Sequence, residues 1–192
     1  MPEAMIDPVS RHSALTPAAS VATFADLTVE QTGPVARFVL RGRQPIVVHA
    51  AGAALQVELA PTVGRVIERD GIAALCLGPD EWLLLGPPEQ ERELQQRLNA
   101  ALQSLPHSLV SIGHRDVAFV LWGRAAADVI NAGCPLDLRM AAFPVGYATR
   151  TLLGKAEIVL WHIEPQAFRI ETARSLAAYV NEFLLLAARN NA

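Results

Sequence analysis

The sequence has little charge, few cysteines and no long apolar run. Of its 192 residues, 18% are charged and 52% are hydrophobic, and the formal net charge is −3. Because an acidic chain has no basic surface to hold phosphates, we do not expect nucleic acid as a partner. No apolar run approaches the roughly 20 residues of a membrane-spanning helix, and the N-terminus lacks the apolar core of a secretory signal. We therefore expect a soluble, cytoplasmic protein.

Two cysteines, Cys76 and Cys134, are the whole thiol content of the chain. Their separation fits neither a disulfide framework nor a Cys-x-x-Cys metal or redox pair, so we expect two buried free thiols in a reducing compartment. The scarcity of charge also indicates that a partner covers part of the surface, although monomers expose much apolar area as well. Composition alone leaves both alternatives open.

The chain divides into an N-terminal arm and a folded remainder. Residues 1–20 include prolines and acidic residues but no apolar core, and they predict a flexible arm. Residues 21–192 are enough to bury a substantial core, and we expect them to form a single compact unit. An alternative is a pair of packed subdomains, about 21–106 and 107–192.

The stretch 75–86 predicts a β-hairpin. Two apolar runs flank the turn Gly78-Pro79-Asp80-Glu81, in which Pro79 fixes φ and the Asp80 side chain can bond its own backbone. Adjacent carboxylates at such a tip are typical of a solvated turn rather than of a catalytic acid–base pair. We expect Trp82 to pack beneath the helix that follows.

Helical spacing of apolar residues predicts three helices. Leucines recur on one face after Pro87-Pro88, so we expect a helix over 88–105. A short helix follows Gly123. A closing helix runs from about residue 173 to residue 189, with Tyr179 off its apolar stripe and available for contacts.

Short apolar or alternating runs between these helices predict strands. Residues 44–64 are ambiguous, and the alternation over 54–59 favours a half-buried strand. The order ββ-α-ββ-α-βββ-α predicts an α+β fold with mostly antiparallel sheets. The hairpin-helix stretches 72–105 and 147–188 share a plan, but their residues are too different to establish a repeat. The other expected strands are 35–41, 72–77, 82–86, 108–112, 117–122, 147–153, 157–163 and 167–171.

The reactive side chains do not form a recognisable constellation. Ser111, His114 and Asp116 are close in sequence, but neighbours on a strand point to opposite faces, so we expect a turn rather than a triad. Cys134 follows a helix C-terminus, whose partial negative charge opposes a thiolate, and we interpret it as core. Gly154-Lys155 lacks the Ser or Thr of a phosphate loop. No metal-ligand spacing connects the histidines, which are His12, His49, His107, His114 and His162. We predict no catalytic, cofactor-binding or metal-binding residue on this chain.

Three motifs together are similar to one family. Residues 77–84 (LGPDEWLL), 133–138 (GCPLDL) and 150–156 (RTLLGKA) resemble, in this order, the gamma subunit of heterotetrameric sarcosine oxidase. The ending around Phe168–Glu171 is also similar to that subunit. The resemblance covers about residues 24–188.

This resemblance implies a small subunit of a bacterial flavoenzyme that oxidatively demethylates sarcosine (N-methylglycine) to glycine. That reaction forms hydrogen peroxide and, with tetrahydrofolate, methylene-tetrahydrofolate. The implied partners are large alpha and beta subunits, which carry FAD, FMN, NAD and the catalytic residues, and a small delta subunit with zinc. The implied fold is that of the folate-binding aminomethyltransferases of the glycine-cleavage T-protein type. The resemblance assigns no folate contact to a residue of this sequence.

Two hypotheses of different classes follow. The first is a noncatalytic structural or assembly subunit, which agrees with the absence of a catalytic constellation in the sequence. The alternative is a small-molecule, folate-type binding protein with a pocket between the two hairpin-helix halves. A third is an unrelated domain with thiol chemistry at Cys134.

Overall fold

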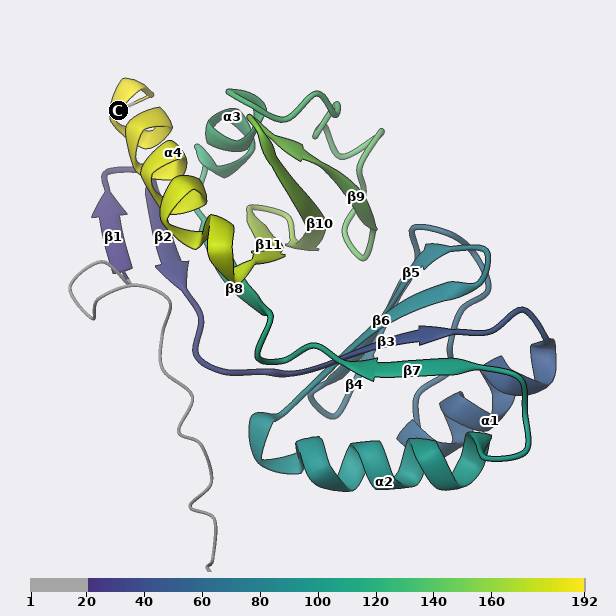
Figure 1. Cartoon of the computed structure of the whole chain (residues 1–192). Helices are drawn as coiled ribbons and strands as arrows, with labels where there is room; N and C mark the ends of the chain where they lie inside the picture. Colours follow the sequence, from purple (N-terminus) through teal and green to yellow (C-terminus); the bar gives the residue numbers. More distant parts are fainter. Residues whose placement is uncertain (1–20, 192) are drawn as a thin grey trace, which may run out of the picture.

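The computed structural model describes residues 21–191 as two sheets with helices on their outer faces (Figure 1). Every neighbouring pair of strands is antiparallel, and the predicted α+β class is confirmed. The predicted arm, residues 1–20, lies outside the described part of the chain. Within the described part, no helix has the length and apolar character needed to cross a membrane.

The first sheet is built from the N-terminal part of the chain after residue 35. Helices α1 (Pro45–Leu55) and α2 (Glu91–Leu102) cover its outer face. Pro88 begins a short 3-10 turn before α2, and the leucines of α2 are buried at helical spacing, as the sequence predicted. In spatial order the strands are β4 (Val66–Arg69), β5 (Ile72–Gly78), β6 (Glu81–Gly86), β3 (Ala36–Arg41) and β7 (Ser108–Ser111).

The second sheet combines the C-terminal half of the chain with the first two strands. Helices α3 (Ala126–Asn131) and α4 (Ala177–Asn190) cover its outer face. A 3-10 turn, Arg174–Leu176, precedes α4, so this helix begins later than the predicted residue 173. In spatial order the strands are β1 (Val21–Phe24), β2 (Leu27–Gln31), β8 (Asp116–Trp122), β11 (Ala167–Ala173), β10 (Ala156–Glu164) and β9 (Ala148–Leu153).

The inner faces of the two sheets pack against each other. Leu75 and Leu83 of the first sheet share a buried cluster with Val159 and Trp161 of the second. The layers are therefore helices, sheet, sheet and helices, which Figure 1 shows from the side. At one end the two backbones join directly, because the Ala148 N–H donates to the Gly64 carbonyl over 2.8 Å.

The two sheets share one topology. The first is made by β3-α1-β4-β5-β6-α2-β7 and the second by β8-α3-β9-β10-β11-α4, and the spatial order β4-β5-β6-β3 of the first matches β9-β10-β11-β8 of the second. The position that β7 occupies beside β3 is occupied beside β8 by β2, which comes from the start of the described chain. The shared plan of 72–105 and 147–188 is thus part of a longer internal repeat. The repeat is completed by a strand distant in sequence.

The strand expected over 54–59 is wrong. Residues 45–55 form helix α1, which begins with Pro45 in its first turn and ends where Gln56 has a φ of 58°. Proline suits a first helical turn and the alanines that follow have high helix propensity. Val57 and Leu59 are buried, as alternation requires, but they belong to an irregular segment that packs into the core of the first sheet.

Sequence patterns do not predict the first two strands, nor the placement of two consecutive strands in different sheets. Strands β1 and β2 form a short hairpin that was not predicted. Strands β7 and β8, which follow each other in the chain, belong to different sheets. Their short connection carries the chain from one sheet to the other.

Candidate functional site

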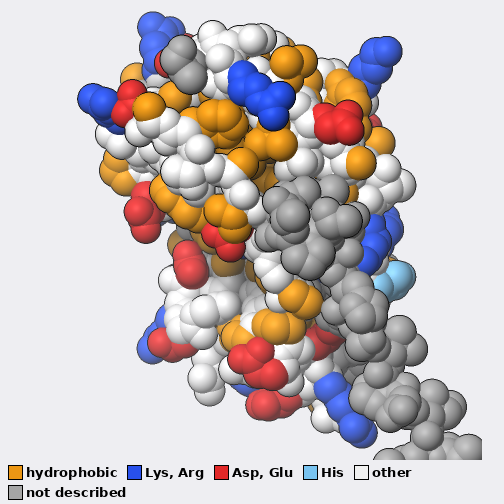
Figure 2. Space-filling model, turned by 90° about the vertical axis from the view of Figure 1, so that its left-hand side faces the viewer, with side chains coloured by type: hydrophobic (Ala, Val, Ile, Leu, Met, Phe, Trp, Pro, Cys, Tyr) orange, Lys and Arg blue, Asp and Glu red, His pale blue; other side chains and the backbone are white. Residues whose placement is uncertain are grey.

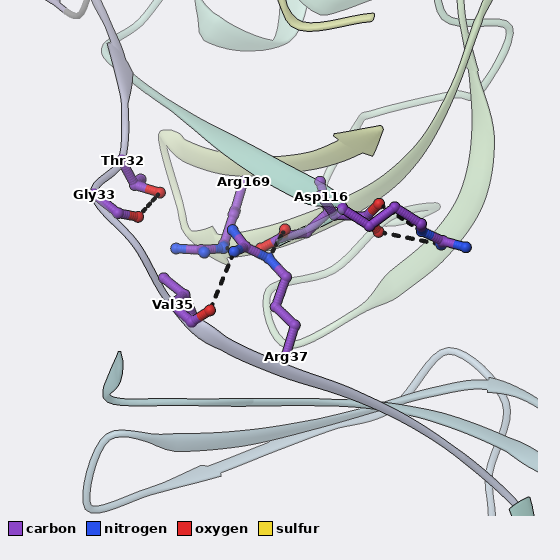
Figure 3. Close-up of polar contacts among 8 residues, drawn as sticks. Thr32, Gly33, Val35, Arg37, Asp116 and Arg169 are labelled. Carbon is purple, nitrogen blue, oxygen red and sulfur yellow. Dashed lines mark hydrogen bonds and ion pairs between the residues drawn. The ribbon is translucent and has the colours of Figure 1, made fainter. Parts of the chain in front are cut away.

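A buried charge cluster joins the two sheets. Arg37 of β3 donates its Nε–H to one oxygen of Glu171 on β11 over 2.7 Å, and Arg169 donates its Nε–H to the other oxygen over 2.7 Å (Figure 3). The side chains of Arg37 and Glu171 are 2% and 3% exposed. Two guanidinium groups share one carboxylate, so the cluster carries a net positive charge. Among the described residues, the Nη2 atoms of Arg37 and Arg169 have no hydrogen-bond acceptor.

A second carboxylate connects the sheets at the hairpin tip. Glu81 is buried and accepts hydrogen bonds from Arg41 of the neighbouring strand and from Arg150 of the second sheet. The predicted solvated turn is therefore wrong for Glu81. Asp80 does face the surface side of the turn, where it pairs with Arg43 over 3.3 Å. The two arginines offset the cost of burying the Glu81 charge, and the bond from Arg150 connects the two sheets.

A cleft of about 370 Å³ lies beside these links. Both sheets contribute to its walls, which include apolar and charged side chains. The charged groups are largely paired already: Asp116 accepts from Arg115 over 3.0 Å, and Arg150 is held by Glu81. The cleft could accept a small ligand, but that ligand would compete with internal ion pairs for the polar groups.

A larger hollow, of about 660 Å³, lies beside α1 on the outer side of the first sheet. Trp82 contributes to its wall together with apolar residues of α1 and of the segment after it. The Trp82 indole is 2% exposed and donates to the Ala60 carbonyl over 3.1 Å. Trp82 shares the core cluster with the leucines of α2, but its hydrogen bond ties it to the segment that follows α1.

The residues Ser111, His114 and Asp116 are not brought together. Ser111 donates its hydroxyl to Glu91 on α2 over 2.8 Å, His114 is exposed, and Asp116 pairs with Arg115. The Asp116 N–H donates to the Ile112 carbonyl over 3.2 Å. The predicted turn is therefore present in place of a triad.

His162 is a packed side chain. Its Nδ1 lies 2.6 Å from the Phe143 carbonyl oxygen, and its ring stacks on Phe168 with 4.3 Å between ring centroids. His12 lies outside the described residues. From residue 21 to residue 191, no group of three or more His, Cys, Asp or Glu residues is arranged to hold a metal ion.

Both thiols are free and buried, as predicted. Burial raises the pKa of the Cys76 thiol, although hydrogen bonding with the Gly78 backbone partly opposes that rise. Cys134 has Thr151 Oγ1 as a neighbour at 3.7 Å. Beside it in the same motif, the exposed Asp137 accepts hydrogen bonds from Arg139, which lower the pKa of its carboxyl to about 2.

Tyr179 lies off the apolar stripe of α4, as predicted, and makes a contact within the chain. Its hydroxyl accepts a hydrogen bond from the Lys155 N–H over 3.0 Å. Gly154-Lys155 is the turn between β9 and β10, and Tyr179 on α4 fixes it from outside. The third motif is thus a packed corner of the second sheet.

Fold and site together define a protein of two packed antiparallel sheets joined by buried ion pairs. The sarcosine oxidase gamma subunit family matches residues 41–190. The chain is 32% identical over 180 residues to the sarcosine oxidase subunit gamma of Corynebacterium sp. strain U-96, covering 93% of this chain and 87% of that protein. It is 36% identical over 124 residues to the corresponding subunit of an Arthrobacter species, covering 64% and 60%. The chain belongs to the sarcosine oxidase gamma subunit family.

Solved structures agree with this assignment. A chain of the heterotetrameric sarcosine oxidase from Corynebacterium sp. U-96 superposes with a TM-score of 0.83 at 30% identity, covering 90% of this chain and 89% of that one. Aminomethyltransferase T of the glycine cleavage system from Bartonella henselae superposes with a TM-score of 0.59 at 17% identity, covering 86% of this chain and 49% of that one. The second match concerns the fold alone, and it confirms the predicted aminomethyltransferase-like architecture.

Proposed function

We propose that this chain is a noncatalytic assembly subunit of a heterotetrameric sarcosine oxidase. The observation that carries the proposal is the family match, which extends over residues 41–190. The chemistry between the sheets supports it, because Glu81 and Glu171 are used to connect one sheet with the other. Carboxylates held between arginines serve the fold rather than a substrate.

The proposed partners are large alpha and beta subunits and a small delta subunit. In this proposal the assembly oxidatively demethylates sarcosine to glycine, with formation of hydrogen peroxide and methylene-tetrahydrofolate, in the cytoplasm. FAD, FMN and NAD belong to the large subunits and zinc to the delta subunit. The gamma chain contributes surfaces and rigidity. Its division into subdomains at about residue 106 stays a prediction.

Co-purification tests the assembly role. We expect a tag on this chain, co-expressed with the neighbouring genes, to recover large subunits with flavin absorbance. Recovery of the tagged chain without any flavoprotein would contradict the proposal.

Turnover of the purified assembly tests the noncatalytic role. Substitutions Asp116→Asn, His114→Ala and Cys134→Ser should leave sarcosine oxidation per bound flavin close to that of the unsubstituted assembly. A loss of more than about tenfold in any of them, at equal subunit content, would assign a catalytic contribution to this chain.

A folate-type binding protein is the second candidate. The cleft of about 370 Å³ lies between the two sheets, where this hypothesis puts a ligand. Its Arg115 and Arg150 have the charge needed for the glutamate carboxylates of a folate, although each is paired with a carboxylate of the chain. Calorimetry of the isolated chain with tetrahydrofolate should give measurable heat if this function is real. The absence of both heat and a thermal shift at millimolar ligand would remove it.

A further inference from the structure

The inner face of the second sheet is only half covered by the first. Strands β9 and β10 contribute Ala148, Val159 and Trp161 to the core between the sheets. In the described chain, no residue of β1, β2 or β8 belongs to that core. On those strands Val21 is 52% and Trp122 40% exposed, whereas Ala118, on the same face of β8, is buried. The first sheet therefore ends before it reaches the far strands of the second.

Cross-strand register sets the uncovered residues in two rows. Residues that alternate with the core positions of β8, β2 and β1 all point away from α3 and α4, because successive side chains in a strand face opposite sides. One row across β11, β8, β2 and β1 is Arg169, Val120, Glu30 and Val21. The next row is Ala167, Trp122, Thr28 and Thr23. We call Val21, Thr28, Glu30, Val120 and Trp122 the uncovered face; Arg169, whose side chain is 15% exposed, lies at its border with the buried charge cluster.

The uncovered face includes two exposed apolar residues, Val21 and Trp122. Figure 2 views the molecule from the side on which β1 lies in Figure 1, and hydrophobic side chains gather on its upper half, over the second sheet and α4. An exposed indole beside an aliphatic residue is costly to leave in water. Tryptophan and arginine are also the residues that most often dominate the binding energy of protein interfaces.

The charged residues in the first row indicate which partner surface would be complementary. Arg169 stands at one end of the first row and shares Glu171 with the buried Arg37, so the local charge there is positive. Glu30 stands in the same row on the other side of Val120. A complementary surface would be apolar opposite Val120 and Trp122, with a carboxylate opposite Arg169 and a donor opposite Glu30.

We propose that the uncovered face docks another subunit of the oxidase, through a protein segment that is apolar at its centre and presents a carboxylate toward Arg169. The inference rests on the proposed function, because it takes the occupant to be a subunit of the same assembly. The docked segment would bury the residues of β8, β2 and β1 that the first sheet does not cover.

Photo-crosslinking identifies the occupant directly. A benzoylphenylalanine probe placed at position 122 of the tagged chain, in the purified assembly, should crosslink to a different subunit, and mass spectrometry should locate the crosslinked segment. A crosslink to residues 1–20 of the same chain, a crosslink to a second copy, or no crosslink would overturn the proposal. A probe at Ile46 on α1, which is 55% exposed, is the control. Equal yields of the same product from both positions would also overturn it.

Subunit exchange measures the contribution of the indole. Trp122→Ala should release the chain from the assembly at least about tenfold faster, Trp122→Phe should retain most of the lifetime, and Ile46→Ala should match the unsubstituted chain. Unchanged release of Trp122→Ala would overturn the proposal. Far-UV circular dichroism and thermal unfolding of the free chains establish that each variant is folded.

The two proposals fail in different ways. If the unsubstituted chain recovers no flavoprotein subunits, the assembly function fails and the docking inference fails with it. If the unsubstituted chain assembles while the probe at 122 reaches no other subunit, only the docking inference fails.

Discussion

Glu171 holds two guanidinium groups in the space between the sheets. Its side chain is 3% exposed, and each of its oxygens accepts one Nε–H. Glu171→Ala would leave the charges of Arg37 and Arg169 without a counter-ion in a buried site. We predict a loss of about 3–5 kcal/mol in the free energy of unfolding, measured by urea denaturation.

The matched control is a carboxylate in a surface ion pair. Asp26 accepts from Arg124 over 2.6 Å, but both side chains are largely open to solvent. Asp26→Ala should therefore cost no more than about 1 kcal/mol. Equal costs for the two variants would mean that burial of the Glu171 cluster has no energetic weight.

Cys76 should react slowly as long as the chain is folded. Burial raises the pKa of its thiol, so at a given pH a smaller fraction is thiolate than in the unfolded chain. In a Cys134→Ser background, we predict that Cys76 reacts with an aromatic disulfide reagent at pH 8 at least about tenfold more slowly than in denaturant. Absorbance of the released thiolate follows the reaction. Equal rates in the folded and denatured chains would contradict the buried placement.

Single residues were predictable where their partners are local. The turn at Asp116 and the free thiols follow from neighbouring sequence and composition. Glu81 could not be assigned in that way, because its partners Arg41 and Arg150 are 40 and 69 residues away. A carboxylate in a turn looks solvated until the opposite sheet is in place.

At the scale of elements, the joint between β4 and β9 depends on two glycines. Gly64 has a φ of +89°, and an added Cβ would lie 2.1 Å from the Tyr147 ring. Gly146 has a φ of +78° with no atom within 4 Å of an added Cβ. We predict that Gly146→Ala costs about 1–2 kcal/mol from backbone conformation alone. Gly64→Ala should cost about 1–3 kcal/mol more, because Tyr147 must move.

Thermal and urea unfolding of the two variants measure this difference. Both positions have the same unfavourable sign of φ, so the comparison isolates the contact with Tyr147. If the two substitutions had equal cost, the close packing at this joint would be absent in solution.

Elements were predictable where periodicity is long. Helix α2 follows from leucines at helical spacing. The alternation over 54–59 is typical of a strand, but Val57 and Leu59 are apolar because they pack into the core of the first sheet from an irregular segment. Strands β1 and β2 have only 4 and 5 residues. Such short runs carry little periodic signal.

At the scale of the whole molecule, β2 completes a sheet whose other core strands lie more than 80 residues further on. Leu27 and Val29 of β2 are buried in the core of the second sheet. Deletion of residues 1–31 would remove both and expose the edge of β8. We predict a loss of about 3–6 kcal/mol in the free energy of unfolding, estimated from the two side chains.

Deletion of residues 1–20 is the control, since it keeps both strands. Circular dichroism and urea unfolding should show that chain to be as stable as the full chain. Equal stability after removal of residues 1–31 would mean that β2 is dispensable to the second sheet.

The whole arrangement could be predicted only in part. The α+β class follows from the order of elements, but the sequence has no sign that β7 and β8 separate into different sheets. Their connection, residues 112–115, resembles an ordinary turn locally. The sheet to which each of these strands belongs depends on its pairing partners, which are distant in sequence.

The pairing of β2 with the distant strand β8 affects the order in which the strands can pair during synthesis. β2 emerges from the ribosome early, yet its neighbour β8 ends at residue 122. The strands and helices of the first sheet, residues 36–111, can collapse on one another while synthesis continues, because their contacts are comparatively local. Strands β1 and β2 can pair with each other early, but β2 has no β8 neighbour until residue 122 has been made, and during that interval Leu27 and Val29 are exposed to chaperones and to aggregation.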